Sequence, residues 1–138
     1  MSFLLDTNAI SEWVKPRPNP GLIGWMESTD EDRVFISVVT LAELRYDVER
    51  LAAGARRRRL EEWLGRELPL RFEGRMLPVD ADVAEAWGKT VSRSEAMGRP
   101  IGAMDAFLAA TAEVHQLTLV TRDVLDFKVL KTVMNPWT

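Results

Sequence analysis

The stretch Phe3-Leu4-Leu5-Asp6-Thr7-Asn8 decides the fold, because a short apolar run in it ends abruptly on a carboxylate and two further polar residues. Three consecutive apolar residues are typical of a strand that is buried on both faces. A helical spacing of apolar residues follows, so the chain passes from this strand directly into a helix. We therefore predict a first strand at residues 2–5, which delivers Asp6 to one end of a sheet, and a helix at residues 7–14.

Strands and helices alternate along the rest of the chain. The β-branched run Val34–Val39 and the run Leu117–Thr121 are the clearest strands. Such alternation implies crossover connections and a mostly parallel sheet covered on both faces. We predict a three-layer α/β fold, with one domain over residues 1–138. The further strands are expected at 34–39, 76–79, 117–121 and 129–133, and the further helices at 22–26, 40–51, 55–68, 80–97 and 101–115.

Capping and breaking residues set the expected helix ends. Thr7 or Asn8 can cap the first helix, and Asp80 can cap the helix that follows it in sequence. Gly54 is expected to end the helix that begins near residue 40. Pro69 is expected to interrupt the next helix, because proline lacks the backbone donor.

Composition excludes several classes of protein. The chain has 138 residues, a formal net charge of -3, no cysteine and one histidine. The lack of cysteine excludes a disulfide framework and thiolate metal sites. The N-terminus has no basic flank typical of a signal peptide, and no apolar run approaches the roughly 20 residues of a membrane helix. We expect a soluble cytoplasmic protein without a membrane partner.

Four acidic residues occupy positions where a site is expected. Asp6 and Asp123 directly follow strands, and ligands of parallel sheets bind beyond the carboxyl ends of the strands. Three of the four also have a purely structural interpretation. Asp6 can form a turn or cap, Asp123 can cap a turn, and Thr40-x-x-Glu43 matches a capping box.

Asp105, the fourth acid, has no such interpretation. It lies in the nearly continuously apolar helix 101–115, which predicts burial, and no Lys or Arg lies one turn away. If the four acids converge they repel one another, and a divalent cation relieves that repulsion. Oxygen ligands without cysteine favour Mg²⁺ or Mn²⁺ over Zn²⁺. Hard metals held by carboxylates typically act on phosphoryl groups.

Four motifs give the chain a resemblance to a known family. They are Leu5-Asp6-Thr7-Asn8, Thr40-Leu41-Ala42-Glu43-Leu44-Arg45, the Asp105 helix, and Leu119-Val120-Thr121-Arg122-Asp123 with Asp126-Phe127. In these motifs the chain resembles the PIN-domain nucleases, and among them the VapC-type toxins of type II toxin–antitoxin modules. The resemblance implies a parallel sheet of four or five strands flanked by helices. It also implies an Mg²⁺- or Mn²⁺-dependent endoribonuclease, a homodimer, and a cognate antitoxin that occludes the acidic site.

The resemblance also assigns roles to the acidic residues. By position, Asp6, Glu43 and Asp105 match the metal-binding acids of the family, and Asp123 matches a fourth acidic position. These four are the expected catalytic and metal-binding residues, which together hold a metal-activated water. Asp126 is the alternative to Asp123 at the fourth position.

Other residues are expected to play supporting parts. Asn8 and Thr121 match family positions that support the acids or orient water, whereas Asp47 replaces a common Gly. Without the four acids the net charge would be about +1, so the remaining surface need not repel RNA. We expect Arg99 to contact an RNA phosphate. The run Arg56–Arg59 suits either a phosphate contact or a solvated helix face.

Other functions remain open at this point. The same fold serves nucleases that process RNA or cleave DNA, and it also suits a catalytically inactive binding module. Four mutually repelling acids argue against the inactive module, because such a module has no need of them. A phosphatase beginning Asp-x-Asp is disfavoured because Asn8 occupies the second acidic position. We do not expect this chain alone to bind DNA in a sequence-specific way.

Overall fold

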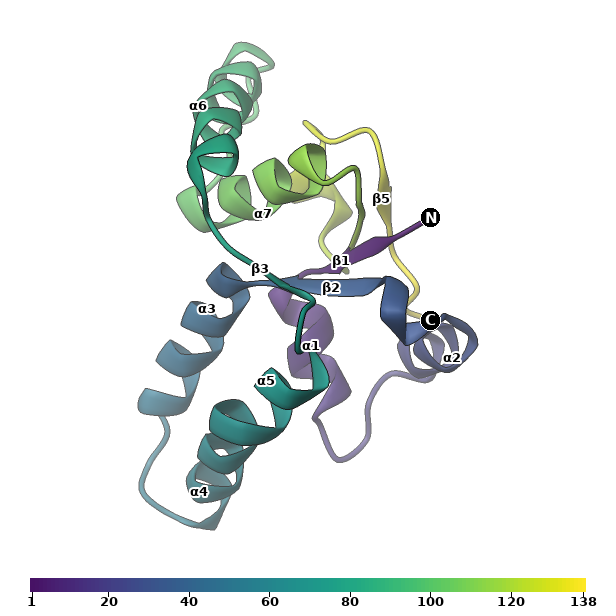
Figure 1. Cartoon of the computed structure of the whole chain (residues 1–138), viewed down its shortest axis with the longest axis vertical. Coiled ribbons are helices and arrows are strands. Elements are labelled where there is room, and N and C mark those ends of the chain that lie inside the picture. The colour runs from purple at the N-terminus through teal and green to yellow at the C-terminus, as the bar shows by residue number, and fades with distance from the viewer.

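A computed structural model describes residues 1–138 and contains one five-stranded sheet (Figure 1). Every strand pairs in parallel with its neighbours, and the order across the sheet is β3-β2-β1-β4-β5. The predicted parallel sheet is confirmed, with five strands. The strands are β1 (Phe3–Leu5), β2 (Val34–Ser37), β3 (Met76–Leu77), β4 (Thr118–Val120) and β5 (Val133–Met134).

Successive side chains of a strand point to opposite faces of the sheet and pack into two separate hydrophobic cores. Phe3 and Leu5 of β1 join one buried cluster, whereas Leu4 between them joins the other. This alternation is the period-two pattern of a strand, and both clusters are apolar because the sheet is covered on both faces. The predicted three-layer arrangement is therefore present.

Helices form the two outer layers, and Figure 1 shows α1, α3, α4 and α5 on one face of the sheet and α6 and α7 on the other. Helix α2 lies beside the C-terminal end of the chain. None of these helices is both long and apolar enough to cross a bilayer. Their bounds are α1 (Thr7–Trp13), α2 (Pro20–Ser28), α3 (Val38–Glu49), α4 (Ala55–Glu62), α5 (Leu68–Arg71), α6 (Ala81–Ala96) and α7 (Ala103–Val114).

One predicted helix cap and one predicted helix start are wrong, whereas the predicted start of α1 at Thr7 is confirmed. Asp6, and not Thr7 or Asn8, caps α1, since its carboxylate accepts a hydrogen bond from the Thr7 amide. Helix α3 begins at Val38, inside the predicted strand 34–39, because the Ser37 hydroxyl accepts from the Val39 amide and caps the helix there. The cap predicted at Asp80 is confirmed by its bond from the Val83 amide.

The predicted ends of the next two helices are also wrong. Gly54 does not end α3, which already stops at Glu49; it caps the start of α4 instead. Pro69 does not break the chain's helical path. A π-helical turn at Trp63–Glu67 widens the helix, and the Leu68 amide donates back to the Trp63 carbonyl. That wider turn lets Pro69 occupy the start of α5, where its missing N–H is tolerated.

The last predicted strand is shifted along the chain. Residues 129–133 were expected to form it, but β5 covers only Val133–Met134. A 3₁₀ turn at Val124–Phe127 lies in the segment between β4 and β5. Its buried Phe127 joins the core cluster on the α7 face of the sheet.

The strand order fixes where a ligand is expected. The chain builds outward from β1 through β2 to β3, and then places β4 and β5 on the opposite side of β1. The order therefore reverses between β1 and β4, and open parallel sheets bind ligands beyond the carboxyl ends at such a point. Asp6 follows β1 and Thr121 follows β4 at that edge.

Candidate active site

A hollow of about 310 Å³ opens at this edge and brings the four predicted acids together. Its lining contains no hydrophobic residue. Asp6 comes from the end of β1, Glu43 from α3, Asp105 from α7 and Asp123 from the segment after β4. The remaining lining residues are Thr7, Asn8, Ser11, Glu12, Lys15, Asp47 and Arg122.

Asp6 is held firmly at the centre of the sheet edge. The register pairs Leu5 with Val120, and the Asp6 amide donates to the Val120 carbonyl at 2.9 Å. Its side chain accepts from the Thr121 hydroxyl and from the Thr7 amide, each at 2.7 Å. Only 6% of Asp6 is exposed. The residue thus caps α1 and also lines the hollow, so its structural and functional interpretations do not exclude each other.

Asn8 and Thr121 connect Asp6 to Asp123. The Asn8 side-chain amide donates to the Thr121 hydroxyl at 3.2 Å and to Asp123 Oδ2 at 3.1 Å. The Asp123 amide donates to the same Thr121 hydroxyl at 3.0 Å. Because Thr121 donates its own proton to Asp6, one hydroxyl orients both acids. The predicted supporting positions of Asn8 and Thr121 agree with these contacts.

Glu43 is held by α1 and not by its own helix. The Thr7 hydroxyl donates to Glu43 Oε1 at 2.7 Å. Thr40 lies inside α3 and not at its start, so the capping-box interpretation of Thr40-x-x-Glu43 is wrong. The Thr40 hydroxyl lies 3.1 Å from that of Thr7, and it must be the donor there because Thr7 has already given its proton to Glu43. The two threonines therefore aim Glu43 into the hollow.

Asp105 lies half-buried in the first turn of α7. Burial raises its pKa to about 6, and the charges of Asp6, Glu43, Asp126 and Asp123 act in the same direction. Burial also raises the pKa of Asp6; the hydrogen bonds from Thr121 and Thr7 oppose this shift, and the charges of Glu43 and Asp123 add to it. The hollow thus gathers carboxylates that repel one another, and no ion pair within the folded chain offsets the repulsion among Asp6, Glu43 and Asp105.

No basic side chain neutralises the three inner acids. Asp6, Glu43 and Asp105 form no ion pair with any Lys or Arg, and Arg122 approaches Asp123 only to 4.0 Å. Buried or half-buried carboxylates without a cation are costly, so the cluster is complementary to a positive ligand.

The hollow also contains an acid that the sequence analysis did not single out. Glu12 is 8% exposed and accepts from Lys15 Nζ and from the Asn19 amide, each at 2.9 Å. The bond from Lys15 lowers the pKa of Glu12, so this carboxylate is already neutralised. Lys15, three residues after Glu12 and just beyond the end of α1, is the sequence signal for this pairing.

Asp126 and Arg99 are not in the hollow. Both line a neighbouring cavity of about 360 Å³, which shares Asp105 with the hollow. Asp123, and not Asp126, is therefore the acid that lines the hollow beside Asp6.

The donor set of the hollow fits a hard divalent cation. All four acids offer carboxylate oxygens, no sulfur or imidazole is present, and no ion pair offsets the repulsion among Asp6, Glu43 and Asp105. As they stand, no three of the acidic side chains are gathered tightly enough to hold an ion. The fit thus rests on the chemistry and the charge of the donors.

Comparisons with known proteins agree with this fold. The model of the PIN domain family matches residues 3–130. Toxin FitB of Neisseria gonorrhoeae is 40% identical over 135 residues, which cover 97% of each chain. VapC ribonuclease Y4jK of Sinorhizobium fredii is 33% identical over 135 residues, covering 97% of this chain and 96% of the relative.

Solved structures are similar over the same length. The structure of FitAB bound to an IR36 DNA fragment has a TM-score of 0.92 at 37% identity, covering 99% of this chain and 96% of the other. The DNA-bound VapBC of Salmonella typhimurium has a TM-score of 0.80 at 26% identity, covering 98% of each. The match to the family model and the identity to both relatives extend over nearly the whole chain. The chain therefore belongs to the PIN-domain family, among relatives that include the VapC ribonucleases and toxin FitB.

Proposed function

We propose that this chain is the ribonuclease toxin of a toxin–antitoxin pair, which hydrolyses RNA phosphodiester bonds with Mg²⁺ or Mn²⁺. The observation that carries the proposal is the convergence of Asp6, Glu43, Asp105 and Asp123 on one hollow, where only Asp123 has a basic partner, Arg122 at 4.0 Å. Relatives named toxin FitB and VapC ribonuclease support the assignment of activity and role.

The four acids are the residues that would hold the metal. A bound divalent ion lowers the pKa of a coordinated water and stabilises negative charge on the phosphoryl group. Thr7 and Thr121 keep the carboxylates of Glu43 and Asp6 pointed into the hollow, so little reorganisation is needed when an ion and RNA arrive. The polar lining keeps the hollow open to water, which is the nucleophile of hydrolysis.

A groove beside the hollow suits the second protein of the pair. The apolar side chains of Leu44, Val48, Leu60 and Trp63 line a cavity of about 470 Å³ between α1, α3 and α4, with Arg56 and Arg59 among its lining. Ser11, Lys15 and Asp47 line both this groove and the hollow. A chain segment bound in the groove would therefore reach the acids and block RNA. The solved FitAB and VapBC assemblies support such a partner.

The test is cleavage of RNA by purified protein with Mg²⁺ or Mn²⁺ and after chelation with EDTA. We expect cleavage only with metal, and its loss by about 100-fold or more in Asp6→Asn and Asp105→Asn variants. Circular dichroism checks that both variants stay folded. Undiminished cleavage by both variants would sink the four-acid proposal.

The role of toxin is tested separately from the chemistry. The protein encoded by an adjacent small reading frame should co-purify with this chain and stop its RNA cleavage. A nuclease that works in RNA processing or DNA cleavage would have no such inhibitor, and an inactive binding module would cleave nothing. Light scattering of the purified chain tests the homodimer that the family resemblance implies.

A further inference from the structure

We propose that the cavity lined by Arg99 and Lys128 binds an RNA phosphate next to the phosphate that is cut. This inference rests on the proposed ribonuclease function and names a second contact for its substrate. The cavity lies beside the acidic hollow, because Asp105 lines both. Its full lining is Ser94, Arg99, Pro100, Ile101, Gly102, Asp105, Leu125, Asp126, Lys128 and Val129.

The two cations of this cavity are unpaired. Neither Arg99 nor Lys128 forms an ion pair with an acidic side chain, whereas Arg57, Arg71 and Arg93 each do. An unpaired guanidinium and ammonium facing one cavity from two different segments favour an anionic ligand, and the substrate of the adjacent hollow is a polyanion. Their charges supply affinity that does not depend on base sequence.

The backbone of Arg99 is anchored, so its side chain starts from a fixed point. Its amide donates to the Ser94 carbonyl at 3.0 Å, and its carbonyl accepts from the Ser94 hydroxyl. Ser94 is 3% exposed at the end of α6, and Gly98 makes the turn before Arg99 with a φ of 70°. Pro100 restricts the backbone of Arg99, the residue before it. A guanidinium whose backbone is held in place loses less conformational entropy on binding than one whose backbone is mobile.

Two carboxylates of the same cavity act against an anion. Asp105 faces the acidic hollow and loses its repulsive effect when a divalent ion is bound there. Asp126 is exposed, so solvent and salt screen its charge. Asp126 therefore weakens phosphate binding without preventing it, which makes it a useful probe of the sign of the ligand's charge.

The experiment measures binding of a short fluorescein-labelled single-stranded RNA by anisotropy, with Mg²⁺ present and Asp6→Asn as the uncut background, and it measures cleavage of the same RNA by each variant made in the otherwise unmodified chain. Arg99→Gln and Lys128→Gln should each weaken binding about 3- to 10-fold, and each should reduce the salt slope by about 0.7. Asp126→Asn should tighten binding about 2- to 3-fold. The matched control is Arg33→Gln, which removes one charge beyond the amino end of β2 and should change binding least.

The outcomes separate this inference from the proposed function. Arg99→Gln and Lys128→Gln could bind RNA as tightly as the Asp6→Asn protein alone, or no more weakly than Arg33→Gln does. Either result would show that the cavity does not bind a phosphate, even if the unmodified chain cleaves RNA. If Asp126→Asn instead weakens binding and metal-dependent cleavage, Asp126 is a metal ligand and the cavity is not a phosphate site. If the unmodified chain cleaves no RNA with either metal, the proposed function itself fails.

Discussion

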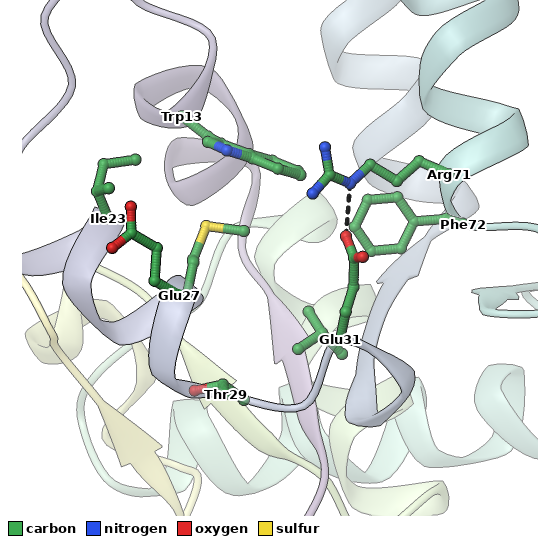
Figure 2. Close-up of a pocket in the computed structure, with 9 residues that line it drawn as sticks. Trp13, Ile23, Glu27, Thr29, Glu31, Arg71 and Phe72 are labelled. Atoms are coloured by element: carbon green, nitrogen blue, oxygen red, sulfur yellow. Dashed lines mark hydrogen bonds and ion pairs between the residues drawn. The ribbon is translucent and has the colours of Figure 1, made fainter.

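The carboxyl and amino edges of the sheet differ in how their charged side chains are paired. At the carboxyl edge, Asp6, Glu43 and Asp105 line one hollow without an ion pair to any Lys or Arg. Near the amino end of β2, Glu31 pairs with Arg71, whose guanidinium lies 4.3 Å from the centre of the Trp13 ring (Figure 2). Figure 2 shows Arg71 between Trp13 and Glu31 in the lining of a cavity of about 320 Å³, so this pair is satisfied within the chain, whereas Glu27 of the same lining forms no ion pair.

This difference separates charges that serve the fold from charges that await a ligand. The Glu31–Arg71 pair is about half-exposed, so it contributes little but costs nothing to desolvate. The three inner acids are more enclosed and repel one another, so they oppose the fold that gathers them. Because this cluster of acids does not stabilise the fold, a functional role is the simplest explanation for it.

The largest expected effect comes from comparing Glu43→Gln with Glu31→Gln. Each change removes one carboxylate charge, but only Glu43 lines the acidic hollow. Glu43→Gln should lower metal-dependent RNA cleavage by about 100-fold or more, whereas Glu31→Gln should leave it within about 2-fold of the unmodified chain. Initial rates measured on one RNA substrate provide the comparison. Equal losses in both variants would mean that the two edges do not differ in function.

A smaller effect is expected on stability, through Asp105. Its pKa is raised to about 6 in the folded chain, so the folded state binds more protons than the unfolded state between about pH 4 and pH 6. The free energy of unfolding without metal therefore falls as the pH rises through this range. The loss persists at pH 7, because Asp105 is then ionised in both states.

Asp105→Asn tests this linkage. In EDTA the variant should melt at about the same temperature as the unmodified chain near pH 4, and about 2–5 °C higher at pH 7. Mg²⁺ at about 100 times its dissociation constant should stabilise the unmodified chain by about 2.7 kcal/mol, and the variant much less. A thermal melt followed by circular dichroism at both pH values measures both effects. A variant that melts below the unmodified chain at pH 7 would contradict the clustering of charge.

The sequence allowed a site residue to be predicted where its place relative to a strand or an apolar helix fixed its position in the fold. Asp6 directly follows one apolar run and Asp123 lies three residues after the end of another, so their place at the carboxyl edge could be predicted from a parallel sheet alone. Asp105 was recognisable because a carboxylate on an apolar helix needs a partner. Glu43 was singled out by its place just inside the helix after the second strand, but a capping box explained it equally well, and only the family resemblance assigned it to the metal site.

Contacts between distant segments could not be read in the same way. The bond from Thr7 to Glu43 depends on how α1 packs against α3, and no local period encodes that crossing. Residues 38 and 39 look like strand because they are β-branched, yet the Ser37 cap starts the helix there. The π turn that accommodates Pro69 left no signal either, since it is an irregularity within an ordinary helical pattern.

The smallest expected effect concerns the amino edge, and it is measured by a double-mutant cycle of Glu31→Gln and Arg71→Gln. The pair is exposed, so its coupling energy should be only about 0.2–1 kcal/mol. Arg71→Gln also removes the contact with the Trp13 ring, so it should cost somewhat more than Glu31→Gln. Urea unfolding of the four proteins gives the coupling. RNA cleavage should be unchanged in all four, because Glu31 and Arg71 are paired with each other and neither lines the acidic hollow. A fall in cleavage that follows the loss of the pair would instead show that Trp13, at the end of α1, transmits its packing to Asp6 and Thr7 at the start of the same helix.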